Sequence, residues 1–136
     1  MPDEDTLAES FWGVARTLRR LWRASLAPWD IAPSHSRALR VLDRDGTMRI
    51  SELTEHLRIA ARSTTEVVDA LEAKGLVERQ ADPADRRATL LALTANGARV
   101  AAAIHSARDE QTHEFFGKLS PADQAHLERI LNQLLA

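Results

Sequence analysis

Two short stretches of the chain carry side chains that could bind a nucleic-acid duplex. One of them is a run of small polar and charged residues: Arg62, Ser63, Thr64, Thr65 and Glu66. The other places Arg86 and Arg87 directly after a segment rich in Asp and Pro. Arginine and hydroxyl groups donate hydrogen bonds to phosphates and base edges, and a glutamate can accept one from a cytosine amine. We therefore predict that both stretches bind a nucleic-acid duplex.

The residue types needed for catalysis are poorly represented. The chain has no Cys and no Tyr, so a thiolate nucleophile, a Cys-based zinc site and thiol redox sensing are excluded. It contains no Gly-rich phosphate loop and no HExxH or GxSxG motif, and its acidic residues are dispersed along predicted helices. We expect neither enzymatic activity nor a cofactor.

The first stretch is predicted to begin a helix over residues 61–74, which ends at Lys74 and Gly75. A shorter helix should precede it from Ile50, with Ser51 as N-cap and Glu52 near the positive end of the helix dipole. Two short helices with a tight connection form a helix-turn-helix, and the second inserts into the major groove. A capping box over residues 63–66 would move the start of this second helix.

Residues 76–80 and 89–93 are predicted to form a β-hairpin, or wing, around the turn-forming segment 82–87. We expect Asp82 or Asp85 to brace one of the two arginines, while the other enters a minor groove about 6 Å wide. The pattern does not distinguish Arg86 from Arg87. Arg79, at the base of the wing, is a candidate DNA contact, although a strand-edge residue or an internal ion-pair partner is the favoured interpretation.

Long helices are predicted at both ends, because apolar residues recur every three or four positions over residues 7–26 and 127–135. Thr94 and Ser120 are the expected N-caps of the last two helices. The predicted fold is mainly α with a small β-hairpin wing, in one domain over residues 1–136. Residues 34–93 would form the winged helix-turn-helix, and residues 1–30 and 95–136 would form dimerisation helices, since their apolar stripes have few partners in so small a domain.

The segments Gly75–Arg79, Asp82–Arg87 and Leu91–Gly97 resemble the MarR family, and the resemblance extends over about the whole chain. It implies a winged-helix transcriptional regulator that binds a pseudo-palindromic operator as a homodimer, usually represses, and is released by a small ligand. The chain departs from the family pattern at Arg58 and Ala60, where Gly and Ser are frequent. It departs again at Glu66, where a basic residue is frequent.

By the same resemblance, an aromatic effector would bind near Trp22, Trp29 and His35, with help from Arg16 or Arg20. The alternative is that the tryptophans fill the core or the dimer interface.

Two other functions stay open. One is a winged-helix protein for nonspecific DNA binding or protein–protein interaction. The other is a metal-responsive regulator, because His105, Asp109 and His113 follow one another at i, i+4 spacing and could share one helix face.

Overall charge and the N-terminal sequence bear on partners and location. The net charge is −2, whereas DNA-binding proteins are usually basic, so any DNA-binding surface must concentrate positive charge locally. The N-terminus is acidic where a secretory signal would be basic, and no apolar run reaches the roughly 20 residues of a membrane span. We expect a cytoplasmic protein with no membrane partner.

Overall fold

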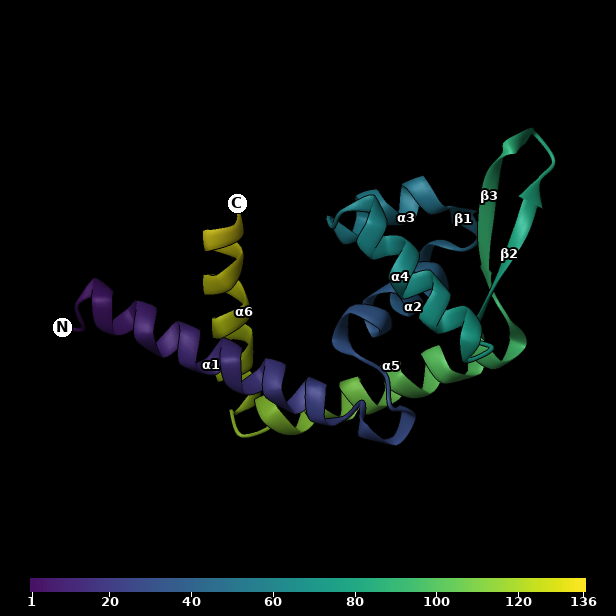
Figure 1. Ribbon diagram of the computed structural model, residues 1–136. Helices are drawn as coiled ribbons and strands as arrows, with labels where there is room; N and C mark the ends of the chain where they lie inside the picture. The colour runs from purple at the N-terminus through teal and green to yellow at the C-terminus, as the bar shows by residue number, and fades with distance from the viewer. The chain divides into compact units, whose positions relative to one another are not determined.

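The computed structural model describes all 136 residues, which form two compact units. The first unit comprises residues 1–24 and 107–136, and the second comprises residues 25–106. Six α-helices and one three-stranded antiparallel sheet make up the fold (Figure 1). The predicted class, mainly α with a small β-hairpin wing, is confirmed.

The second unit contains the helix-turn-helix and the sheet. Its elements in chain order are a short 3-10 helix (Ala27–Trp29), α2 (Pro33–Asp45), β1 (Met48–Arg49), α3 (Ile50–Leu57), α4 (Ala61–Ala73), β2 (Val77–Asp82), β3 (Asp85–Leu93) and the first half of α5 (Ala95–Phe116). The strand order is β1-β3-β2, with Met48 opposite Leu91 and Val77 opposite Leu93. Strand β1 was not predicted, because two residues are too few to show an alternating pattern.

The core of this unit takes leucines from α2, α3, α4 and β3. Leu39 of α2, Leu53 of α3, Leu71 of α4 and Leu91 of β3 are almost completely buried. Burying a leucine side chain contributes roughly 1.5–3 kcal/mol, so these residues fix α3 and α4 against the sheet. The helix-turn-helix is therefore held from its inner side, and its outer side is left to solvent.

The connections around α3 and α4 differ in part from the prediction. Ser51 lies inside α3 and is not its N-cap; Arg49 takes that position, and its backbone N–H donates to the Glu52 carboxylate at 3.2 Å. The helix α4 begins at Ala61 without any side-chain cap, so the predicted capping box over residues 63–66 does not form. Arg58 ends α3 with a left-handed φ of 54°, a conformation that costs a non-glycine residue roughly 1–2 kcal/mol.

The hairpin is fastened to the start of α5 by a close backbone contact. The Thr94 hydroxyl accepts the Gly97 N–H at 2.9 Å, as expected of an N-cap, and donates to the Gly75 carbonyl at 2.6 Å. A Cβ atom on Gly97 would lie only 1.8 Å from the Leu76 carbonyl oxygen. Only glycine allows this approach, so position 97 fixes how the wing strands meet α5.

The first unit consists of α1 (Glu4–Ala24), the second half of α5 and α6 (Pro121–Leu135). Trp22 of α1 donates its indole N–H to the Thr112 hydroxyl of α5 at 2.9 Å, and the Arg108 guanidinium lies 3.7 Å from the centre of the Trp22 ring. Ser120 caps α6, as predicted, by accepting the Asp123 N–H. No helix of the chain has the length and apolar character needed to cross a membrane.

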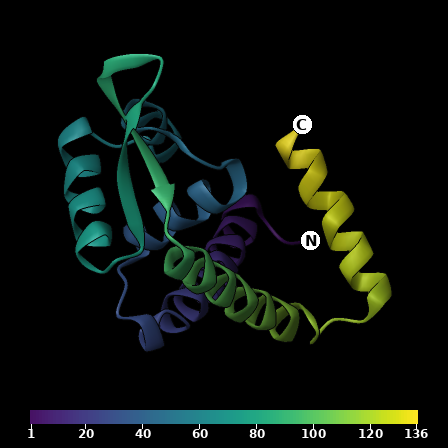
Figure 2. The same ribbon diagram turned by 90° about the vertical axis from the view of Figure 1, so that its right-hand side faces the viewer.

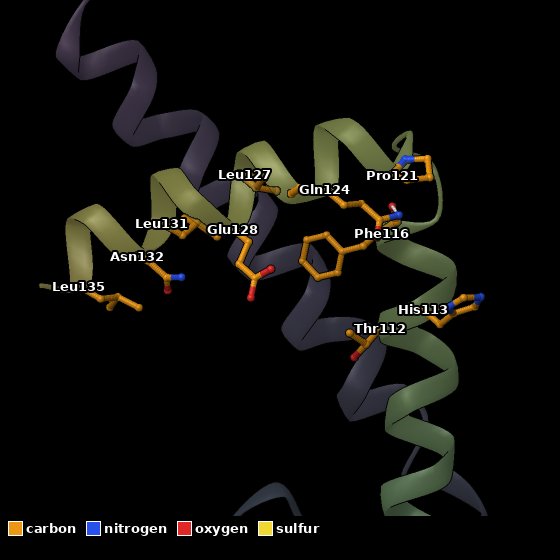
Figure 3. A pocket seen from close by; sticks show the side chains of 11 residues that line it. Thr112, His113, Phe116, Pro121, Gln124, Leu127, Glu128, Leu131, Asn132 and Leu135 are labelled. Atoms are coloured by element: carbon orange, nitrogen blue, oxygen red, sulfur yellow. Dashed lines mark hydrogen bonds between the residues drawn. The ribbon is translucent and has the colours of Figure 1, made fainter.

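The first unit leaves much apolar surface uncovered. Neither α1 nor α6 contains a buried residue. An open groove of about 660 Å³ lies between α6 and the end of α5, where Phe116 of α5 and Leu127, Leu131 and Leu135 of α6 contribute apolar side chains (Figure 3). This unit therefore has an incomplete core within a single chain.

Candidate nucleic-acid interface

The helix α4 has one buried face and one exposed face. Its buried residues are Thr64, Val67, Val68 and Leu71. Because successive residues of a helix are rotated by about 100°, the opposite side carries Arg62, Thr65, Glu66 and Asp69, all of which are exposed. Ser63, at the edge between the two faces, is half-buried. The polar run seen in the sequence thus divides between the two faces.

Thr64 is a structural residue, which corrects its prediction as a DNA contact. Its side chain is completely buried, and its hydroxyl accepts a hydrogen bond from the Thr54 hydroxyl of α3 at 2.9 Å. It also lies 3.4 Å from the Ala60 carbonyl oxygen. Thr64 therefore links the two helices of the helix-turn-helix and does not reach the outer surface of α4.

Arg79 of β2 forms an internal ion pair, which is one of the two interpretations that the sequence favoured over DNA contact. Its guanidinium contacts Asp69 at 2.7 Å and Glu72 at 2.6 Å, both on α4. The hydrogen bond to Asp69, with the charge of Glu72, raises the pKa of Arg79 above its ordinary value. These contacts tie the wing to α4 and neutralise part of the negative charge of the helix.

Asp82 braces the wing, but with a partner that the sequence did not indicate. It is 8% exposed, accepts the Ala84 N–H at 2.9 Å, and pairs with Arg49 at 2.8 Å. The Ala84 N–H, and then Arg49, hold the pKa of Asp82 below its usual range. Arg49 lies 33 positions away in the sequence and approaches only because β1 joins the sheet, so no local pattern could have identified it.

The two wing arginines lie on β3, whereas the sequence predicted them at the tip of the hairpin. The strands extend further than expected, and the turn contains only Pro83 and Ala84. Both arginine side chains are exposed. The Asp85 carboxylate accepts the Arg87 backbone N–H at 3.0 Å and lies 3.7 Å from the Arg87 guanidinium. The Arg87 side chain is 94% exposed, so this ion pair contributes little free energy. Both arginine side chains are therefore accessible to a duplex.

Figures 1 and 2 show the hairpin extending beyond the helices of its unit, with α4 beside it. Adjacent side chains of a strand point to opposite faces, so Arg86 and Arg87 project from the two sides of a narrow ribbon. Arg58 and Arg62 are also exposed. Together the four arginines concentrate positive charge locally, although the net charge of the whole chain is −2. This arrangement can donate hydrogen bonds to phosphates and base edges.

The other predicted residues lie outside this surface. Trp29 packs partly against the core of the second unit, and His35 is a half-buried residue of α2, whereas Trp22 belongs to the first unit. His105, Asp109 and His113 are exposed on α5, and no group of three or more His, Asp or Glu side chains is placed to hold a metal ion.

The comparisons with known proteins agree with this architecture. A model of the MarR family matches residues 31–89. The multiple antibiotic resistance protein MarR of Salmonella typhimurium is 31% identical over 117 residues, which cover 85% of this chain and 81% of that protein. The uncharacterised HTH-type transcriptional regulator YsmB of Bacillus subtilis is 29% identical over 128 residues, which cover 94% and 88%. A solved structure, a mutant of MarR from E. coli complexed with operator DNA, has a TM-score of 0.77 and 27% identity, and the match covers 96% of this chain and 94% of that one.

The helix-turn-helix, the three-stranded sheet and the arginine-bearing hairpin define a winged-helix protein of the transcriptional-regulator class. The chain belongs to the MarR family. It is thus a transcriptional regulator and not an enzyme, as the absence of catalytic motifs led us to expect.

Proposed function

We propose that the chain is a homodimeric repressor that binds a pseudo-palindromic DNA operator, with α4 in the major groove and the β2–β3 wing in the adjacent minor groove. One observation carries the proposal. Within a single unit, α4 exposes Arg62 and Thr65 while the hairpin beside it exposes Arg86 and Arg87. The sign of regulation follows from the family resemblance.

Charge pairing supports the use of this surface. Arg79 neutralises acids of α4, and Arg49 pairs with Asp82 of the wing. Fewer unpaired carboxylates therefore lie near the exposed arginines than the composition of the chain suggests. Screening limits the influence of distant acidic helices to about a Debye length, near 8–10 Å, so the overall charge of −2 is compatible with phosphate binding.

Dimerisation is supported by the terminal helices. Large apolar side chains on α1 and α6 are exposed: Leu7, Phe11, Trp12, Val14, Ile130, Leu134 and Leu135. Monomeric proteins rarely leave so many large apolar side chains of two helices in water, and a second copy would cover the same side chains on both subunits. A two-fold dimer also presents two α4 helices to two half-sites.

The dimer has its own test. Sedimentation equilibrium should give twice the chain mass of 15.1 kDa, and Trp12→Glu should shift the population toward monomer while the second unit stays folded. A monomeric wild-type protein at micromolar concentration would contradict the dimer.

The wing assignment is tested by replacing its arginines one at a time with alanine. We expect Arg86→Ala or Arg87→Ala to weaken operator binding and to lower the slope of log affinity against log salt by about 1 for each phosphate that is no longer neutralised. Arg99→Ala is the matched control, because Arg99 is an exposed arginine on α5 of the same unit. Unchanged affinity and unchanged slope in both wing variants would refute the wing contact.

Nonspecific DNA binding is the rival function. A true operator-binding protein should prefer its site over unrelated duplex by a factor of at least about 10³ at physiological salt. A ratio near one would favour nonspecific DNA binding. This comparison needs only the wild-type protein.

We include release by a small aromatic acid in the proposal. Trp22 is the candidate contact that the structure best defines, but Arg108 already covers one face of its ring. An effector that stacks on this ring would therefore compete with Arg108, and its carboxylate would displace the guanidinium. Candidate acids at millimolar concentration should quench tryptophan fluorescence and weaken operator binding together; quenching without weaker DNA binding would count against release.

A further inference from the structure

We propose that Glu66 determines sequence specificity by accepting a hydrogen bond from the exocyclic amine of a cytosine in each operator half-site. The inference rests on the proposed function, because it assumes that α4 enters the major groove. It adds the identity of a base that α4 recognises, which the fold alone does not determine.

Glu66 is the only acidic residue of α4 that is not neutralised. The helix has three carboxylates, and Arg79 pairs with two of them, Asp69 and Glu72. Glu66 is exposed and forms no ion pair, even with Arg62 one turn earlier. A basic residue four positions before an acidic one is the weaker order for a pair along a helix, so the carboxylate stays available.

The position of Glu66 places it on the outermost part of α4. The buried residues Thr64, Val67, Val68 and Leu71 define the inner face, and rotation by about 100° per residue places Arg62 and Glu66 almost opposite it. A duplex that contacts Arg62 through the major groove must therefore also meet Glu66. A negative charge at this position repels phosphate, so it disfavours every binding mode that leaves it facing the backbone.

The base edges of the major groove leave one good partner for a carboxylate, which is an acceptor only. Guanine presents two acceptors, and thymine presents an acceptor and a methyl group. Adenine offers an amine, but its N7 acceptor lies beside it. Cytosine offers its N4 amine alone, so it is the base that Glu66 should select.

Arg62 provides a second read-out at a fixed spacing. Four residues of helix advance about 6 Å, and base pairs are about 3.4 Å apart. Arg62 prefers the O6 and N7 acceptors of guanine. The expected half-site therefore contains a guanine and a cytosine within about two base pairs of each other.

The experiment is selection of binding sites from a randomised duplex pool, followed by affinity measurements on the selected sites. Four proteins are compared: wild type, Glu66→Ala, Glu66→Gln and Asp43→Asn. Asp43 is an exposed carboxylate of α2 in the same unit, so its replacement controls for the loss of one negative charge. Because Glu66 is exposed and unpaired, its variants should fold, and circular dichroism checks this directly.

We expect wild type and Asp43→Asn to enrich cytosine at one position of each half-site, with about a tenfold loss of affinity when that base pair is changed. Glu66→Ala should lose the preference at that position and keep the others. Glu66→Gln should shift the preference toward adenine, whose N6 and N7 atoms match a glutamine amide.

Two results would overturn the inference, and they differ in what they say of the proposed function. If both Glu66 variants select the wild-type sequence and only bind all duplexes more tightly, Glu66 repels phosphate and reads no base, while the operator-binding function stands. If wild type enriches no sequence at all, sequence-specific binding itself fails, and the role of Glu66 fails with it.

Discussion

Replacing Gly97 by alanine should destabilise the second unit, because a side chain there collides with the start of the wing. The added Cβ would lie 1.8 Å from the Leu76 carbonyl oxygen and 2.8 Å from its carbonyl carbon, whereas real Cβ atoms essentially never approach within 3.0 Å. The same carbonyl accepts the Thr94 N–H at 3.1 Å. The backbone must therefore move, and the hydrogen bond that closes the hairpin moves with it.

The size of the effect follows from three contributions. Overpacking of this kind costs about 1–3 kcal/mol, and breaking the Thr94 hydrogen bond to the Leu76 carbonyl costs about 1 kcal/mol. Alanine favours helix over glycine by about 1 kcal/mol, which offsets part of this. We expect the free energy of unfolding of Gly97→Ala to fall by about 1–3 kcal/mol, which lowers Tm by roughly 4–12 °C in a domain of this size.

The assay is urea unfolding at a fixed protein concentration, since an oligomer gains stability with concentration. Gly13→Ala in α1 is the matched control, because a Cβ on Gly13 meets nothing within 4 Å in the chain; it should leave stability unchanged or raise it slightly. If Gly97→Ala unfolds at the wild-type urea concentration or above, the close approach of α5 to Leu76 is not a feature of the protein.

Three further substitutions or conditions test other parts of the fold. Thr64→Val should lower the free energy of unfolding by about 1 kcal/mol, because it removes the hydrogen bond with Thr54. Urea unfolding measures this, and the selected DNA sequence should not change; an altered sequence would show that Thr64 does read DNA. Arg58→Gly should raise thermal stability by about 1 kcal/mol, because glycine adopts the left-handed φ of 54° without strain; a lower Tm would refute that strain. The pKa of Asp82 is depressed below the ordinary 3.8, so its stabilisation is present above that pH and is lost as the pH falls through the folded-state value. Exchange of the Ala84 amide proton, corrected for intrinsic rate, should therefore accelerate in acid, and Asp82→Asn should abolish that dependence.

Local signals in the sequence were sufficient for most helix boundaries. Thr94 and Ser120 cap the helices that they were predicted to cap, and Gly46 and Gly75 follow α2 and α4 with the positive φ that such positions need. Capping and turn formation depend on a few neighbouring residues, so sequence alone carries that information. At Ser51 the same reasoning failed: α3 begins at Ile50, directly after strand β1, and its N-cap is Arg49.

Contacts between distant residues could not be predicted in the same way. The hydroxyl of Thr64 resembled those of Ser63 and Thr65 in the sequence, and only the start of α4 at Ala61 determines that it faces inward. Pairing of Asp82 with Arg49 depends on the sheet order β1-β3-β2, which no local pattern encodes. The polar segments were found from the sequence, but which side chain of each segment is exposed required the tertiary structure.

The most direct test of the account is binding of the purified protein to the intergenic DNA upstream of its own gene, in competition with unrelated duplex over a series of salt concentrations. The account predicts tight binding that resists the competitor, a steep dependence on salt and two protomers per site. Binding that the unrelated duplex removes equally well, at that DNA and at sites selected from a random pool, would contradict sequence-specific regulation by this chain.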